Sequence, residues 1–206
     1  LPDCAEKECG DDGCGGSCGE CPADDPCRSA CDTSLGVGLC APALAEEFAC
    51  DGVDEDCDGE TDEGVCAPVV FVVNAAADDD DGTCDAAHCS LREALSAAQA
   101  AFGTVSVGFA LEGPGPHVLT PSSALPALTR TLVLDATTQA GYVDAPIVEL
   151  DGSGAGESVS GLTVSAGDVL VRGLAVYGFT SHGISIEPGA DRSRIERCFV
   201  GLSPST

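Results

Sequence analysis

The cysteines of this chain are distributed very unevenly. Of the 14 cysteines, 11 lie within residues 1–66, at positions 4, 9, 14, 18, 21, 27, 31, 40, 50, 57 and 66. Few apolar residues in this segment are large, so it cannot bury enough surface to fold unaided. We therefore expect disulfides, and a metal where one binds, to hold it together. Because disulfides persist in oxidising compartments, the chain is predicted to be secreted.

The overall charge excludes two classes of partner. Lys and Arg number 8 against 35 Asp and Glu, which gives a formal net charge of −27. Such a surface repels phosphate backbones and anionic membranes, so nucleic-acid binding is not expected. No run of 18 apolar residues occurs, so membrane insertion is not expected either. The chain begins at Leu1 and contains no Met, which predicts a mature protein whose signal peptide has been removed.

Composition divides the chain into four predicted parts. Residues 1–48 form a Cys/Gly-rich, disulfide-stapled module that is largely irregular. Residues 49–66 form an Asp-rich metal-binding loop, and residues 67–112 form a cap that contains one helix. Residues 113–206 have the pattern of short apolar strands separated by glycines.

One amphipathic helix is predicted over residues 90–102. Ser90 and Glu93 form a capping box, in which each side chain binds a free backbone N–H at the start of the helix. Apolar residues then recur at positions 91, 94, 95, 98 and 102, the spacing of one buried stripe. Gly103 is expected to end the helix. Arg92 lies off the stripe and is expected to be exposed and paired with a neighbouring acid.

Short strands are predicted after the helix, where branched apolar residues occur at strand spacing. These strands are residues 104–109, 132–134, 147–150, 162–164, 169–176, 183–186 and 194–200.

The strands repeat at a nearly constant distance along the chain. The segment that begins at Val171 aligns with the segment that begins at Ile195, an offset of 195 − 171 = 24, which matches Val176 with Val200. Leu150 and Leu174 are again 24 residues apart. Spacing of this size with glycine at the corners is typical of a solenoid. The predicted fold class is mostly β: a short right-handed parallel β-helix whose first coil is covered by the helix.

Three motifs carry resemblances to known families. The sequence CSLREAL at residues 89–95, with Phe71-Val-Val-Asn and an Asp-Gly-x-Cys stretch before it, resembles the CSLREA domain. Residues 51–64 resemble a metal-binding motif of bacterial surface proteins, and the segment from Cys9 to Cys21 is similar to Cys/Gly-rich modules of such proteins. The resemblances imply a pectate-lyase-like β-helix in a bacterial protein that is secreted or displayed on the cell surface.

Residues 51–64 also follow the pattern of a calcium loop. Carboxylates alternate before Gly59, where the chain must turn, but Val65 stands where a calcium loop carries its bidentate carboxylate. The candidate ligands are Asp51, Asp54, Asp56, Asp58, Glu60, Asp62 and Glu63. Residues 1–66 contain no His, which disfavours copper and zinc. We expect a structural Ca²⁺ here, with a solvated acidic loop as the alternative.

A second, weaker acidic cluster follows the first apolar segment of the cap. Its members are Asn74, Asp78, Asp79, Asp80, Asp81 and Asp85. Four consecutive acids lack the alternation of a calcium loop, although a turn can bring non-adjacent ones together. A calcium site and a plain solvated turn therefore both remain open.

The remaining cysteines allow one pairing to be predicted. Cys84 and Cys89 are close enough in sequence to form a disulfide around a turn. The 11 cysteines of residues 1–66 are an odd number, so either one of them reaches Cys198 or one is left for another chain. The offset of 24 places Cys198 opposite Leu174, at an inward position, which favours a buried thiol.

The expected function is structural or adhesive. His182 lies in a segment that faintly resembles a strand of polygalacturonases, but residues 113–206 lack the paired acids that glycoside hydrolysis requires. We expect a surface protein stabilised by calcium and disulfides. Its partners would be further copies, through the open end of the solenoid, in a fibre or surface layer, or other surface proteins and glycans. The alternative is a polysaccharide-binding or polysaccharide-cleaving β-helix module.

Overall fold

The computed structural model describes residues 30–32, 39–41 and 67–204. The chain divides into two compact units, Leu1–Ala67 and Pro68–Thr206. In the first unit, β1 (Ala30–Asp32) pairs antiparallel with β2 (Leu39–Ala41). The predicted calcium loop of residues 51–63 and the predicted boundary at residue 48 lie outside the described residues.

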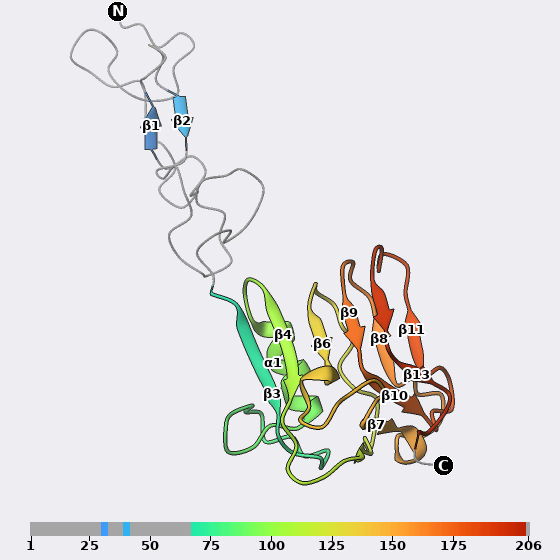
Figure 1. Ribbon diagram of the computed structural model, residues 1–206. Helices are drawn as coiled ribbons and strands as arrows, with labels where there is room; N and C mark the ends of the chain where they lie inside the picture. The colour runs from blue at the N-terminus through green and yellow to red at the C-terminus, as the bar shows by residue number, and fades with distance from the viewer. Residues whose placement is uncertain (1–29, 33–38, 42–66, 205–206) are drawn as a thin grey trace, which may run out of the picture. The chain divides into compact units, whose positions relative to one another are not determined.

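The second unit is mostly strand, and every strand pair in its described residues is parallel. One sheet has five strands in spatial order: β3 (Val69–Val73), β4 (Val105–Phe109), β6 (Val133–Asp135), β9 (Leu170–Arg172) and β12 (Arg194–Glu196). A second sheet has four: β5 (His117–Leu119), β7 (Val148–Asp151), β10 (Leu174–Tyr177) and β13 (Phe199–Val200). The third sheet contains β8 (Leu162–Val164) and β11 (Ile184–Ile186) (Figure 1).

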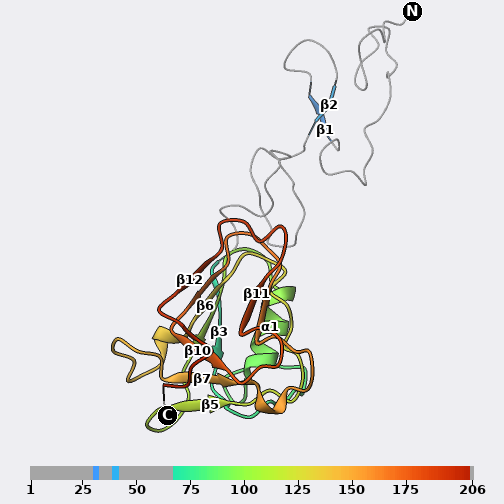
Figure 2. The same ribbon diagram turned by 90° about the vertical axis from the view of Figure 1, so that its right-hand side faces the viewer.

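The chain passes through the three sheets in a fixed order. It runs through β6, β7 and β8, then through β9, β10 and β11, placing one strand in each sheet each time. We call one such passage a circuit. A bridge between Leu128 and Val164 extends the third sheet to an earlier circuit. Figure 2 looks along the stack and shows the sheets as walls around a common interior. Two short 3₁₀ helices, η2 (Ala136–Thr138) and η3 (Gly152–Gly154), follow β6 and β7.

The register confirms part of the predicted repeat and corrects another part. Val171 pairs with Ile195 and Val176 with Val200, both at the predicted offset of 24. Leu150, however, pairs with Val176 and not with Leu174, so the offset between β7 and β10 is 176 − 150 = 26. Between β8 and β11 it is 22, because Leu162 pairs with Ile184. The repeat is therefore irregular because the corner loops differ in length.

Two predicted strands are each broken by a corner. Gly173 separates β9 from β10 with a φ of 77°, and Arg197 separates β12 from β13 with a φ of 54°. A residue in this left-handed region turns the chain and interrupts the strand pleat. The predicted strands over residues 169–176 and 194–200 are therefore two strands each, in two different sheets.

The interior is filled by columns of apolar side chains that run across the sheets. In the five-stranded sheet the register stacks Phe71, Val107, Leu134, Val171 and Ile195 in one column. The three central members are fully buried, whereas Phe71 is half-buried and Ile195 is 37% exposed. We call this set the core column. Such burial of branched side chains supplies most of the stabilisation of a stacked parallel sheet.

The predicted helix is present but shorter. Helix α1 spans Leu91–Ala100 with Ser90 as its N-cap, and both hydrogen bonds of the capping box form. It packs against β3 and β4 through buried residues that include Leu91, Ala94, Leu95 and Ala98. The chain turns to an extended conformation at Ala101 to enter β4, so the predicted end at residue 102 is wrong and Phe102 is 46% exposed.

Arg92 differs from its prediction in one respect. It pairs with an acid as expected, but its side chain is only 13% exposed.

No helix in the part of the chain that the structure describes is both long and apolar enough to cross a membrane.

Candidate metal centre

The segment between β3 and α1, residues 74–90, forms a folded loop that we call the cap loop. The predicted disulfide joins Cys84 to Cys89 within it. The Asn74 side chain, at the end of β3, donates to the carbonyl oxygens of Asp85 (3.0 Å) and Ala86 (3.2 Å) and accepts from the Cys89 N–H (2.7 Å). The Asp85 carboxylate accepts from the backbone N–H groups of Ala87 (2.7 Å) and His88 (3.0 Å). These bonds fix the position of His88.

Glu93 connects the helix to the cap loop. Its carboxylate accepts from the Ser90 N–H (2.7 Å), as a capping box requires, and also from the Asp81 N–H (2.8 Å). The side chain is almost completely buried. Burial alone would raise the pKa of Glu93, but the N–H donors of Ser90 and Asp81 outweigh it and hold the pKa below its ordinary value. Glu93 is therefore a buried carboxylate that stays ionised.

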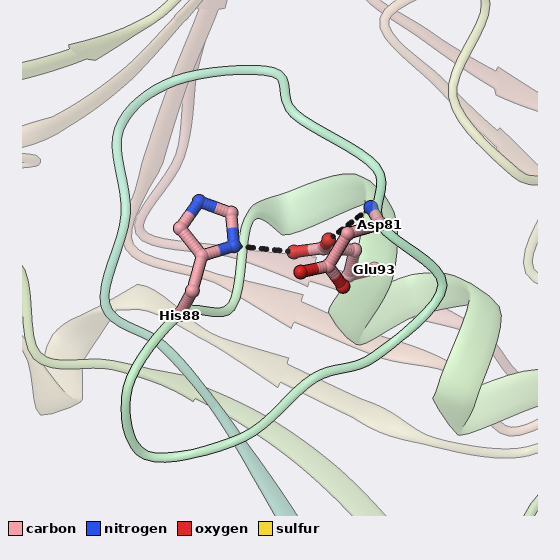
Figure 3. A group of neighbouring side chains, drawn as sticks. All are labelled: Asp81, His88 and Glu93. Atoms are coloured by element: carbon pink, nitrogen blue, oxygen red, sulfur yellow. Dashed lines mark hydrogen bonds and ion pairs between the residues drawn. The ribbon is translucent and has the colours of Figure 1, made fainter.

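His88 lies against this carboxylate (Figure 3). Its Nδ1 atom is 3.2 Å from Oε2 of Glu93. That contact has the length of an ion pair but lacks the alignment of a hydrogen bond, and Nδ1 is shielded from solvent. On the other side of the ring, Nε2 is 3.7 Å from the Asp79 carboxylate.

Asp81, His88 and Glu93 together could hold a metal ion. One ligand atom from each lies within 4.8 Å of the other two, and among the described residues this is the one such group of three or more. The ligands of a bound zinc ion lie roughly 3.4 Å apart in a tetrahedral arrangement, so a small closure would be needed. An imidazole with two carboxylates suits zinc and similar divalent ions better than calcium, which prefers oxygen ligands.

The structure places most of the second acidic cluster elsewhere. Asp78 binds Arg92 through two hydrogen bonds of 3.0 and 2.9 Å and accepts from the backbone N–H (2.7 Å) and the hydroxyl (2.8 Å) of Ser122. Burial would raise the pKa of Asp78, but these donors outweigh it and lower the pKa. Asp80 accepts from the Gly82 N–H in an exposed turn. Asp78 is thus a clamp between the cap loop and the segment that follows β5.

The sequence identified one of the three residues of this centre in advance. Asp81 belongs to the predicted cluster, whereas Glu93 was assigned only a capping role and His88 no role. Each residue in isolation has an ordinary explanation, and only the folding of the cap loop onto the start of α1 brings them together. A His three residues after Asp85 and two before a capping box was the available signal, and it is weak.

Cys198 is the remaining cysteine of the second unit. It forms no disulfide with any cysteine of the described ranges, and its half-buried side chain packs against the core. Burial raises the pKa of its thiol. This agrees with the inward position that the sequence favoured.

Comparisons of the chain with protein-family models, with curated proteins and with solved structures gave no match. The resemblance of residues 89–95 to the CSLREA domain therefore stays a prediction.

Proposed function

We propose that the chain is an extracellular structural protein whose second unit is a right-handed parallel β-helix that associates with further copies. The fixed order of the three sheets, the parallel pairing and the core column support the β-helix. The 14 cysteines and the Cys84–Cys89 disulfide support a location outside the cytoplasm.

One observation carries the proposal of association. The strands that lie farthest along the described chain expose large apolar side chains in all three sheets: Ile186 in β11, Ile195 in β12, and Phe199 and Val200 in β13. Each of these strands has one strand partner among the described residues. Apolar surface at an open strand edge favours pairing with another strand, and soluble proteins usually protect such edges.

The other end of the stack, at the cap loop and α1, is held by several local contacts. There, the disulfide, the capping box and the Asp78–Arg92 pair tie the cap loop to α1 and to the segment after β5. Such resistance to unfolding suits an adhesive or structural role. We propose that a metal ion at Asp81, His88 and Glu93 strengthens this end, and that Ca²⁺ binds residues 51–63 as the sequence predicts.

Sedimentation velocity of the non-reduced full chain tests the association. We expect species much larger than 20.5 kDa that grow with protein concentration in millimolar calcium and zinc. Chelator and reductant should reduce them, because chelator removes the proposed metal ions and reductant opens the Cys84–Cys89 disulfide of the cap loop. A monomer at every concentration and in every buffer would contradict the proposal.

Thermal unfolding tests the metal. We expect zinc to raise the unfolding midpoint of the wild type, because a ligand that binds only the folded state stabilises it, by about 2.7 kcal/mol at 100 times its Kd. His88→Ala should abolish this response, whereas His182→Ala, which changes an exposed histidine outside the centre, should keep it. Equal zinc responses in both variants would refute the centre. A calcium response that survives in His88→Ala would belong to a different site.

A further inference from the structure

We propose that Asp79 is a positioning residue of the metal centre: it holds the proton of the His88 ring on Nε2, so that Nδ1 binds the ion. This inference rests on the proposed metal ion at Asp81, His88 and Glu93, and it names the residue that orients the imidazole ligand. Asp79 acts through His88 and does not itself bind the ion.

The two nitrogens of the His88 ring face two different carboxylates. Nδ1 points toward Glu93 and Asp81, whereas Nε2 points away from both (Figure 3). Nδ1 is 3.2 Å from Oε2 of Glu93, and Nε2 is 3.7 Å from Oδ2 of Asp79. With the ring in this orientation, Nδ1 is the nitrogen that can share an ion with the other two members of the centre.

The surroundings of Nδ1 suit a lone pair better than a proton. Nδ1 is buried and has no hydrogen-bond partner among the described residues. A proton on Nδ1 would therefore be a buried donor without an aligned acceptor, which destabilises a fold. A lone pair on Nδ1 instead faces the ionised carboxylate of Glu93. A cation between these two acceptors would satisfy both of them.

Asp79 provides the acceptor that this form of the ring needs. A neutral imidazole carries one N–H, so a lone pair on Nδ1 requires the proton on Nε2, the nitrogen that faces Asp79. The backbone of Asp79 is tied to the start of α1, because its carbonyl oxygen accepts from the Ser90 hydroxyl at 2.6 Å. The Asp79 side chain is 71% exposed, so a rotation of this side chain can bring its carboxylate to hydrogen-bond distance of Nε2.

A bound ion and Asp79 should strengthen each other's contact with the ring. An ion on Nδ1 withdraws electron density and makes the Nε2–H a stronger donor, and a carboxylate on Nε2–H makes Nδ1 a more basic ligand. Metal-binding histidines generally donate their second N–H in this way. The adjacent Asp80 has a different partner, because its carboxylate accepts from the Gly82 N–H. The two neighbouring acids should therefore contribute unequally to metal binding.

Three substitutions separate the position of this carboxylate from its charge. Asp79→Ala removes both the charge and the acceptor, whereas Asp79→Asn removes the charge and keeps an oxygen that can accept from Nε2–H. Asp80→Asn is the matched control, since it removes the same charge one residue away and keeps the acceptor for Gly82. Calorimetric titration of the non-reduced full chain measures zinc affinity. The part of the signal that is absent in His88→Ala belongs to the centre.

We expect Asp79→Ala to weaken zinc binding at the centre by about 10- to 100-fold. Asp79→Asn and Asp80→Asn should each weaken it much less, because both keep the hydrogen bond to Nε2–H and lose only a charge that solvent screens. Thermal midpoints of the metal-free variants near that of the wild type verify folding.

A spectroscopic measurement on the wild type identifies the binding nitrogen directly and needs no variant at Asp79. The chain contains three histidines, and long-range ¹H–¹⁵N spectra of the histidine-labelled full chain distinguish the two nitrogens of each ring. His88→Ala assigns the signals of His88. We expect equimolar zinc to give the pattern of coordination through Nδ1 with a proton on Nε2.

The outcomes separate this inference from the proposed function. Equal losses of zinc affinity in Asp79→Ala and Asp80→Asn, or coordination through Nε2, would overturn the role of Asp79 and leave the metal centre standing. If the wild type shows no zinc binding that His88→Ala abolishes, the centre and the role of Asp79 are both wrong.

Discussion

At the scale of single residues, one charged pair of the second unit connects two successive circuits. Asp135 and Arg172 are neighbours in register between β6 and β9, and Arg172 donates to the Asp135 carboxylate at 2.6 Å. The same carboxylate accepts from the N–H (3.0 Å) and the hydroxyl (2.6 Å) of Thr137 at the start of η2. It therefore fixes both a corner and a stacking contact.

This carboxylate should make stability depend on pH. Burial would raise the pKa of Asp135, but the donors of Arg172 and Thr137 outweigh it and hold the pKa below its ordinary value of 3.8. A carboxyl group whose pKa is lower in the folded state stabilises the protein above its unfolded pKa, and this stabilisation is lost as the pH falls through the folded pKa. Asp135→Asn should lower the free energy of unfolding by about 1–2 kcal/mol at pH 7.

Urea unfolding at pH 7, 5 and 3 measures that difference. The gap between wild type and Asp135→Asn should narrow as the pH drops below 3.8. Asp151→Asn is the control, because Asp151 accepts from the Ser153 N–H at the start of η3 in the same way, and its cost should be smaller. A gap that is constant from pH 7 to 3 would show that the ionised carboxylate does not stabilise the fold.

At the scale of elements, the corners decide where strands end. Gly173 has a φ of 77°, and a Cβ atom there would lie 2.7 Å from Cγ2 and 2.9 Å from the backbone N of Thr137. The left-handed φ therefore favours glycine here, and the close approach to the neighbouring circuit leaves no room for a Cβ atom. Arg197 occupies the corresponding corner 24 residues later with a φ of 54°, so it is the close approach that makes glycine necessary at residue 173.

Replacing this glycine separates the two effects. Gly173→Ala should lower the free energy of unfolding by about 3 kcal/mol, from left-handed strain together with overpacking. Gly189→Ala is the matched control, since its φ is 97° but the nearest atom to its Cβ would be 3.9 Å away; only strain remains, about 1 kcal/mol. Chemical denaturation of both variants gives the comparison. Equal losses would mean that the contact with Thr137 is unimportant.

The elements differ in how well the sequence predicts them. The capping box and apolar stripe predicted α1 to within two residues, because these signals are local. The breaks at Gly173 and Arg197 were missed because the apolar pattern continues across them in both strands. β3 and β5 were also missed: the apolar segment of β3 was noted only as part of a motif, and His117-Val-Leu in β5 is too short to be distinctive.

At the scale of the whole molecule, the parallel arrangement of the strands could be predicted from the sequence. The register between strands could be predicted only in part. One offset of 24 residues identified stacked strands, and pairing at Val171 and Val176 confirms it. The partner predicted for Leu150 was wrong, because the register of β7 with β10 depends on how many residues the corners between them contain. The grouping of Asp81, His88 and Glu93, which could hold a metal ion, depends on contacts between the cap loop and α1 that no periodicity in the sequence records. The predicted calcium loop of residues 51–63 stays a prediction.

The register also has a consequence for how this unit folds. Among the described strand pairs, the widest separation along the chain is between Leu134 and Val171, 171 − 134 = 37 residues. Paired strands are therefore always neighbours in successive circuits. Folding can start at the circuit that contacts the cap loop and α1, and proceed one circuit at a time. Unfolding would follow the reverse path. The backbone amides of β11, β12 and β13 would exchange with solvent first, while those of β4 and α1 would be the last to open.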